Sequence, residues 1–244
     1  MTKYVTAEQC LDAIQSDSAW RKKEISSLKQ RVAGADGETR TIMMRAGILI
    51  LYAHWEGFVK FASETYITHI NERIDRFNAP LNEHYQTLLM WRCVQRKGDY
   101  PHSKAPVGFL DVMQDWKNRP DKKLSDDMID AESNLNSKVL RKILRIIDIP
   151  FADFESKQNL IDEKLLGRRN PIAHGEKRVI DVDEYNEADQ EVRMLLETFQ
   201  QKIEGCIQNS SFVERQAADA EARTEATVQA CRIEPEGPEQ HHPQ

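Results

Sequence analysis

The sequence is poor in cysteine, proline and glycine, and each shortage excludes a class of protein. Its four cysteines, Cys10, Cys93, Cys206 and Cys231, are scattered and form no Cys-x-x-Cys pair. This spacing does not fit a disulfide framework or a zinc cluster, and it does fit the reducing cytosol. Only 10 glycines and 9 prolines occur in 244 residues, so long uninterrupted helices are possible.

Long apolar runs are also absent. The longest apolar run without a charge covers residues 46–55, which is too short to cross roughly 30 Å of bilayer hydrocarbon. The first ten residues, MTKYVTAEQC, lack the basic and then apolar pattern of a signal peptide. We therefore expect a soluble, cytoplasmic protein without a membrane partner.

Basic residues are fewer than acidic ones, 34 against 40, and the formal net charge is −6. Nucleic-acid-binding proteins usually have a basic balance, so this charge counts against a large nucleic-acid footprint, but not against a local basic cleft. With 40% hydrophobic and 30% charged residues, the composition suits one globular domain with extensions, or two small domains.

Helical periodicity dominates the sequence, and the best strand candidate, residues 179–182, is short. We therefore expect an all-α helical bundle with an N-terminal helical extension and a disordered C-terminal tail. Residues 1–37 form the expected extension, with one or two amphipathic helices and a Gly-Ala-Asp-Gly turn. Residues 38–209 form the expected helical domain. Residues 210–244, rich in Ala, Glu, Gln and Arg, form the expected tail.

The most apolar segment, residues 38–74, contains no proline. It is apolar on most sides, which is typical of a helix at the centre of a bundle. Gly47 and Gly57 each lower helix propensity by about 1 kcal/mol, so we expect them to allow close approach of a neighbouring helix. The apolar stripe of this helix comprises Ile42, Ala46, Leu49 and Ala53, widened by Met43, Ile50 and Phe58.

Shorter helices are expected in the rest of the domain. Asn134 is expected to cap one of them, whose outer face carries four basic residues spaced i, i+3, i+4 and i+7. Such a stripe is most often a solvated face, but beside a cleft it could bind an RNA backbone. Its members are Lys138, Arg141, Lys142 and Arg145. The expected helices are 81–95, 109–116, 134–148, 156–169 and 183–208, and a loop is expected at 98–106. The buried stripe of helix 183–208 is expected to comprise Val192, Leu195, Phe199 and Ile203.

Residues 167–175 gather two cations, an amide and an imidazole between two expected helices. Arginine offers a planar set of donors that matches phosphate oxygens, and the proton of histidine moves easily near neutral pH. RNA cleavage by the 2′-hydroxyl needs a base, an acid and a cation at the phosphorane, and it requires no metal. Arg169, Asn170 and His174 are therefore the candidate catalytic residues, and Arg168 is a candidate RNA contact.

The motif alone is weak. An arginine followed five residues later by histidine should occur by chance in about a third of chains this long, and an Asn directly after the Arg lowers this to about one in a hundred. A looser match also occurs: Arg96 lies just before a Gly- and Pro-containing loop, and His102 lies within that loop. The context of the motif therefore decides its meaning.

Three stretches together resemble the HEPN superfamily, in its stand-alone branch of RiboL-PSP-HEPN-like and related toxin-like proteins. Residues 51–60, LYAHWEGFVK, look like the early core helix of this branch with its aromatic-Glu-Gly pattern. Residues 133–140, SNLNSKVL, leading to Ile149-Pro150, look like its middle helix. Residues 169–175, RNPIAHG, look like its Arg-Asn-x3-His motif followed by Gly. The resemblance covers residues 40–209.

This resemblance implies a HEPN-like helical bundle, a homodimer, and metal-independent RNase activity at a composite site between two copies. It makes Arg169 the phosphate-stabilising cation, His174 the proton-transfer residue and Asn170 the polar residue that orients the site. Side chains five positions apart on a helix point about 140° from each other, so geometry also favours a site shared across a two-fold axis. One HEPN branch has a modified Tyr two residues after the His; Glu176 stands here and does not fit that mode of silencing.

Each motif residue also has a structural interpretation. Asn170 could cap a helix that begins at Pro171, because proline disfavours helical backbone in the residue before it. His174 could bind a carbonyl in the core, and Arg169 could form a salt bridge at a helix end. We favour a role in the site for His174 and Arg169, and leave both interpretations of Asn170 open.

Two other charged residues fit a structural role better than a chemical one. Arg168 fits solvent, or a pair with Glu163 or Glu176, better than it fits RNA. Glu56 lies on a largely apolar helix, where an unpaired charge would be costly. We expect Glu56 to pair with an arginine in the core, and support of the site is the alternative.

The sequence therefore predicts a metal-independent endoribonuclease without a cofactor, acting in phage defence or as a toxin. Its expected partners are a second copy, an RNA substrate, and an antitoxin or regulatory protein. The main alternative is a non-catalytic HEPN-fold module for RNA or nucleotide binding or for dimerisation, and a third is a helical scaffold. His241 and His242 are too isolated to form a metal site, and no HExxH, glycine-rich phosphate loop or GxSxG motif occurs.

Overall fold

The computed structural model describes residues 4–96, 123–124, 126–132 and 134–214, without the side chains of residues 92–96 and 126. The loop at 98–106, the helix at 109–116 and nearly all of the expected tail lie outside these residues. Within them, every regular element is helical, and the one extended pairing is an isolated bridge between Leu81 and Val213. The all-α prediction is confirmed, and residues 179–182 form no strand.

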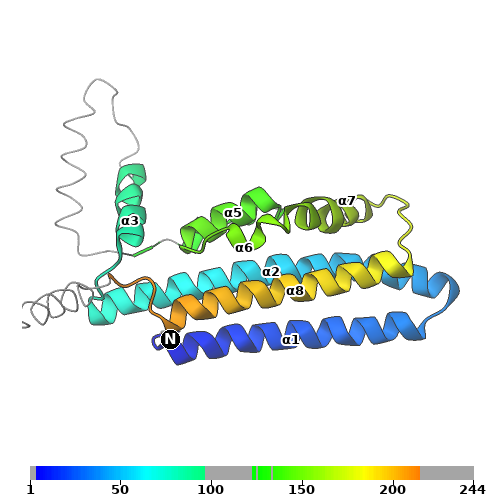
Figure 1. Cartoon of the computed structure of the whole chain (residues 1–244), viewed down its shortest axis with the longest axis horizontal. Helices are drawn as coiled ribbons and strands as arrows, with labels where there is room; N and C mark the ends of the chain where they lie inside the picture. Colours follow the sequence, from blue (N-terminus) through cyan, green and yellow to red (C-terminus); the bar gives the residue numbers. More distant parts are fainter. Residues whose placement is uncertain (1–3, 97–122, 125, 133, 215–244) are drawn as a thin grey trace, which may run out of the picture. The chain divides into compact units, whose positions relative to one another are not determined.

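Three long helices run side by side in Figure 1: α1 (Ala7–Gly34), α2 (Gly37–Phe77) and α8 (Val182–Gln208). α2 and α8 run in one direction and α1 in the other. The turn between α1 and α2 uses Gly37 at φ +47°, a left-handed conformation that glycine adopts readily. The expected N-terminal helical extension corresponds to α1, which packs against both α2 and α8.

Shorter helices lie along one side of the long ones (Figure 1). A π-helical segment, η3 (Leu160–Leu166), continues directly into α7 (Gly167–Ala173), and both contact α2. No helix in the described ranges is long and apolar enough to cross a membrane. The other elements are α3 (Glu83–Arg96), the 3-10 helix η2 (Asp126–Met128), α5 (Ser137–Ile146) and α6 (Ala152–Glu155).

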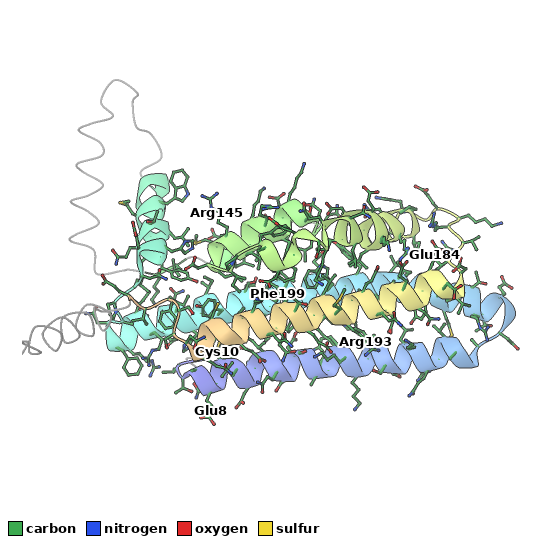
Figure 2. All side chains as sticks on the ribbon, viewed as in Figure 1. Glu8, Cys10, Arg145, Glu184, Arg193 and Phe199 are labelled. Atoms are coloured by element: carbon green, nitrogen blue, oxygen red, sulfur yellow. The ribbon has the colours of Figure 1, made fainter. Side chains whose placement is uncertain are left out.

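Aromatic rings join the two sets of helices. Phe199 of α8 lies with its ring centroid 6.1 Å from those of Trp55 and Phe58 on α2, and 6.4 Å from that of Phe154 on α6. Figure 2 shows Phe199 inside the bundle, and all four rings are fully buried. The expected stripe of α8 is confirmed, since Val192, Leu195, Phe199 and Ile203 are all 0% exposed.

α2 is the central helix, as expected, but its predicted apolar stripe is not its buried face. Ile42 is 58% exposed, Ala46 and Ala53 are exposed, and Leu49 is only partly buried. Other sides of α2 are covered by α1, α8 and the η3–α7 helix. Because α2 has apolar residues all round, periodicity alone does not tell which side its neighbours cover.

Gly47 and Gly57 let neighbouring helices approach α2 closely, which confirms their expected role. A β-carbon at Gly47 would lie 2.6 Å from a ring carbon of Tyr185 on α8. A β-carbon at Gly57 would lie 2.8 Å from Nη1 of Arg21 on α1. The contact at Gly47 is the more rigid, because the ring of Tyr185 is only 1% exposed.

Gly47→Ala should lower the free energy of unfolding, measured by urea denaturation. Overpacking a core costs about 1–3 kcal/mol, which exceeds a gain in helix propensity of about 1 kcal/mol. Gly205→Ala in α8 is the control, because nothing lies within 4 Å of its β-carbon, and it should raise stability by about 0.5–1 kcal/mol. Equal stabilisation by both variants would contradict the close approach of α8 at Gly47.

Candidate functional site

Arg169 lies on α7, and an aromatic ring and two amides hold its guanidinium. The Cζ atom of Arg169 lies 4.8 Å from the ring centroid of Tyr52 on α2. Its Nη1 donates hydrogen bonds to Oδ1 of Asn134 at 2.8 Å and to Oδ1 of Asn170 at 2.9 Å. These partners are neutral, and no carboxylate in the described part of the chain forms an ion pair with Arg169. The contacts therefore fix the side chain without cancelling its charge.

Tyr52 connects this cluster to Glu56 and to the segment before α5. Its hydroxyl accepts a hydrogen bond from the backbone N–H of Leu135 at 2.6 Å, and the Glu56 carboxylate, one helical turn further along α2, acts on the same hydroxyl. Burial, and then the Glu56 carboxylate, raises the pKa of Tyr52, so the phenol stays protonated. Oε2 of Glu56 is buried without a hydrogen bond in the described part of the chain, and the expected pair with an arginine is not found among the described residues.

Asn134 is free to bind Arg169 because another residue caps α5. The side chain of Asn136 accepts a hydrogen bond from the N–H three residues on, at 2.9 Å, so α5 begins at Ser137. The N–H and the hydroxyl of Ser137 both donate to the carboxylate of Asp162 in η3, at 2.6 and 2.5 Å. The expected cap at Asn134 is therefore wrong by two residues.

The interpretation of Asn170 as a helix cap is also wrong. α7 continues through Asn170 and Pro171, and the amide oxygen of Asn170 binds Arg169. A proline inside a helix removes one N–H donor. Here the π-helical segment changes the register just before it, with the N–H of Gly167 bonded to the carbonyl of Asp162, five residues back.

His174 lies exposed at the C-terminal end of α7. Its ring forms no hydrogen bond with any residue that the structure describes, whereas the rings of His69 and His84 each contact a backbone carbonyl. The segment after it is tied to α2, because Nη2 of Arg45 donates to the carbonyl of Glu176 at 2.8 Å. The imidazole of His174 is therefore exposed and has no structural partner in the described part of the chain.

Three sequence segments meet at Arg169, and the comparison with known families concerns the same segments. Residues 16–205 match the model of the family RiboL-PSP-HEPN. The chain belongs to this family. Neither a curated protein nor a solved structure matches it significantly. The matched part of this HEPN chain begins within α1, earlier than the resemblance in the sequence, and it includes Tyr52, Asn134 and the Arg169–His174 motif.

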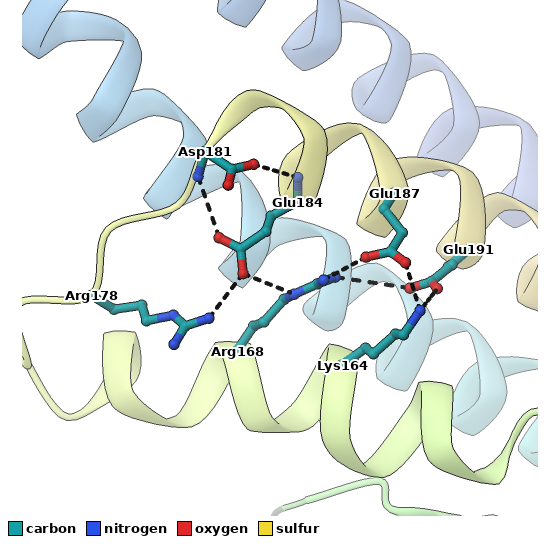
Figure 3. A network of polar contacts seen from close by, with 7 residues as sticks. All are labelled: Lys164, Arg168, Arg178, Asp181, Glu184, Glu187 and Glu191. Atoms are coloured by element: carbon teal, nitrogen blue, oxygen red, sulfur yellow. Dashed lines mark hydrogen bonds and ion pairs between the residues drawn. The ribbon is translucent and has the colours of Figure 1, made fainter.

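In this HEPN bundle, Arg168 points into a group of carboxylates on α8 (Figure 3). Arg168 is only 9% exposed. Its Nη2 lies 2.5 Å from Glu187, its Nε 3.8 Å from Glu184 and its Nη1 4.0 Å from Glu191. The side chain is thus placed between α7 and α8, not at a surface that could contact RNA. Its partners are distant in the sequence and differ from the two expected glutamates.

The same network shifts the pKa of two carboxyl groups in opposite directions. Hydrogen bonds from Lys164 and then from Arg168 lower the pKa of Glu187. Burial, and then the charge of Glu187, raises the pKa of Glu191, whose Oε2 is buried without a hydrogen bond in the described part of the chain. Arg178 and the capping residue Asp181 bind Glu184 at the edge of the network. These contacts fix the HEPN motif helix α7 to the start of α8.

The remaining predicted residues lie outside the Arg169 cluster. All four basic residues of α5 are exposed, and Lys142 forms an ion pair with Glu132 at 2.6 Å. In the described segments no group of three or more His, Cys, Asp or Glu side chains is arranged to hold a metal ion. Tyr52 was not among the predicted site residues, although its spacing of four from Glu56 on one helix could have indicated it.

Glu191→Gln should raise the free energy of unfolding at neutral pH. The fold raises the pKa of Glu191, so the stability that protonated Glu191 contributes is present at low pH and is lost as pH rises through that pKa. The difference between variant and wild type should therefore shrink on acidification. Glu187→Gln should lower the free energy of unfolding at neutral pH. The fold lowers the pKa of Glu187, so its carboxylate contributes stability at neutral pH that is lost as pH falls through that pKa. Urea denaturation at several pH values measures both, and the same sign for both variants would contradict the network.

Proposed function

We propose that this protein is a metal-independent endoribonuclease in which Arg169 binds the phosphate that is cleaved and His174 transfers protons. The contrast between two neighbouring arginines carries the proposal. Arg168 is buried against carboxylates, whereas Arg169 is held by Tyr52, Asn134 and Asn170, which are neutral. A fixed guanidinium with an uncancelled charge is preorganised to bind a phosphate.

The proposed reaction uses the 2′-hydroxyl of the RNA itself. A base removes the 2′-hydroxyl proton, the 2′-oxygen attacks the phosphorus, and the bond from phosphorus to the 5′-oxygen breaks. An acid gives a proton to the leaving 5′-oxygen, so the products are a 2′,3′-cyclic phosphate and a 5′-hydroxyl. Arg169 stabilises the charge on the phosphorane, and two copies of His174 serve as base and acid.

An exposed apolar stripe on α2 supports a homodimer with a shared site. Around the axis of α2, Glu56 lies between Tyr52 and Ala53, about 40° from the first and about 60° from the second. The stripe therefore borders the cluster that holds Arg169. A second copy packed on the stripe with two-fold symmetry would bring two such clusters, and two HEPN motifs, close to the axis. The exposed members of the stripe are Ile42, Ala46 and Ala53.

A nuclease of this kind must be restrained in its own cell. We therefore propose, in line with the HEPN family, a cytoplasmic role in phage defence or as a toxin. An antitoxin or regulatory partner would control it.

The purified protein should cleave single-stranded RNA in EDTA. His174→Ala and Arg169→Ala should each lower the rate about a hundredfold or more, because general acid–base catalysis contributes about 10²–10⁴. Arg31→Ala, on the exposed end of α1, is the control and should retain the rate. Product analysis by gel and mass spectrometry should identify the cyclic phosphate.

Wild-type rates in both motif variants would show that the site is assigned wrongly. RNA binding without any cleavage would favour the non-catalytic module. In the same assay, a purified heterodimer of Arg169→Ala and His174→Ala chains should be more active than either mutant homodimer, since it holds one intact Arg and one intact His, although it lacks one of the two proton-transfer groups. A heterodimer no more active than the two mutant homodimers would contradict a shared site.

A further inference from the structure

Helix α5 is a strongly basic element in an acidic chain. It carries four basic and no acidic residues, within a protein of net charge −6. All four are exposed and lie on one face of the helix. Figure 2 shows Arg145 on the side of α5 that faces away from the long helices. The stripe comprises Lys138, Arg141, Lys142 and Arg145.

The C-terminal end of α5 lines a hollow of about 390 Å³. This volume falls within the range of about 300–1,000 Å³ that is common for ligand pockets. Arg141 and Arg145, one helical turn apart, contribute two guanidinium groups to its wall. The rest of the lining comes from the start of α3 and from the segment between α5 and α6: His84, Asp148, Ile149, Pro150 and Phe151.

The groups in this hollow leave a net positive charge. The guanidinium of Arg141 lies over the ring of Phe151, 3.8 Å from its centroid, which positions it without neutralising it. Neither Arg141 nor Arg145 forms an ion pair with a carboxylate in the described ranges. The one acidic residue of the lining, Asp148, is already bound: its Oδ2 accepts a hydrogen bond from Asn82 at 3.4 Å, and its Oδ1 lies 3.7 Å from Nδ1 of His84.

α5 also connects this hollow to the Arg169 cluster. The segment just before α5 contains Asn134, which binds Arg169. With a rise of about 1.5 Å per residue, Arg145 lies about 12 Å along the helix axis from Ser137. The basic stripe therefore leads from the end of α5 near Arg169 to the hollow at its other end.

We propose that the hollow is an exosite, which binds a phosphodiester of the RNA strand away from the bond that is cleaved. The proposal rests on the proposed function for its substrate, but its test measures binding and not cleavage. Arginine pairs recognise phosphate oxygens through charge-assisted hydrogen bonds. A free nucleotide carries the same phosphate chemistry, so the experiment includes it as a separate arm.

The test uses fluorescence anisotropy with a labelled single-stranded RNA long enough to span α5, in a His174→Ala background. Changing both Arg141 and Arg145 to Gln should weaken binding at least tenfold. It should also reduce the slope of log K against log salt by about 1.4, because each lost phosphate contact on a single strand contributes about 0.7. The control pair, Lys23→Gln with Arg31→Gln, removes the same charge from exposed positions of α1 and should change the affinity much less.

Equal weakening by the two pairs would overturn the exosite, because only net charge would then matter. AMP binding that depends on Arg141 and Arg145, with RNA affinity unchanged, would also overturn it and identify a nucleotide site. In a chain that keeps His174, changing both Arg141 and Arg145 to Gln should lower kcat/KM more for long RNA than for a dinucleotide, which cannot reach the hollow. A protein that binds RNA in this way without cleaving it would refute the nuclease and retain the binding site.

Discussion

The guanidinium of Arg169 is the point at which three distant segments of this HEPN chain meet. It lies over the ring of Tyr52 in α2 and donates to Asn134 before α5, while its own helix supplies Asn170. Hydrogen bonds and an aromatic face hold the cation in place, and none of these partners is negative. The same contacts that join the segments thus leave the positive charge of Arg169 uncancelled, as the proposed phosphate site requires.

The orientation of Arg169 depends in turn on how α7 is held. Consecutive residues on a helix point about 100° apart, so Arg168 and Arg169 cannot face the same neighbours. Arg168 faces the carboxylates of α8 and contributes to a network that ties α7 to that helix. The cost of burying its charge is offset only because carboxylates surround it. One arginine therefore serves the fold, and the next faces other neighbours, none of which is a carboxylate in the described part of the chain.

Periodicity and special residues predicted much of this structure. The central position of α2, the stripe of α8 and the close approach at Gly47 follow from local patterns, because neighbours three and four apart share a helix face. Contacts between distant segments did not follow in this way. The partners of Arg168 lie on α8, and Tyr52 acquires its role only when Leu135 and Arg169 reach it. Ile42 is exposed although it fits the apolar pattern, since no local signal tells which faces of a helix its neighbours cover.

Asn134→Asp shows whether the neutral partners of Arg169 keep its charge available for a phosphate. The change has nearly the same shape but places a carboxylate where the amide oxygen lies 2.8 Å from Nη1 of Arg169. The measurement is the rate of RNA cleavage together with the melting temperature. Our account predicts an unchanged or higher melting temperature, because an ion pair forms, and a rate at least tenfold lower, because that pair cancels the charge. Wild-type cleavage by a folded Asn134→Asp variant would contradict the account.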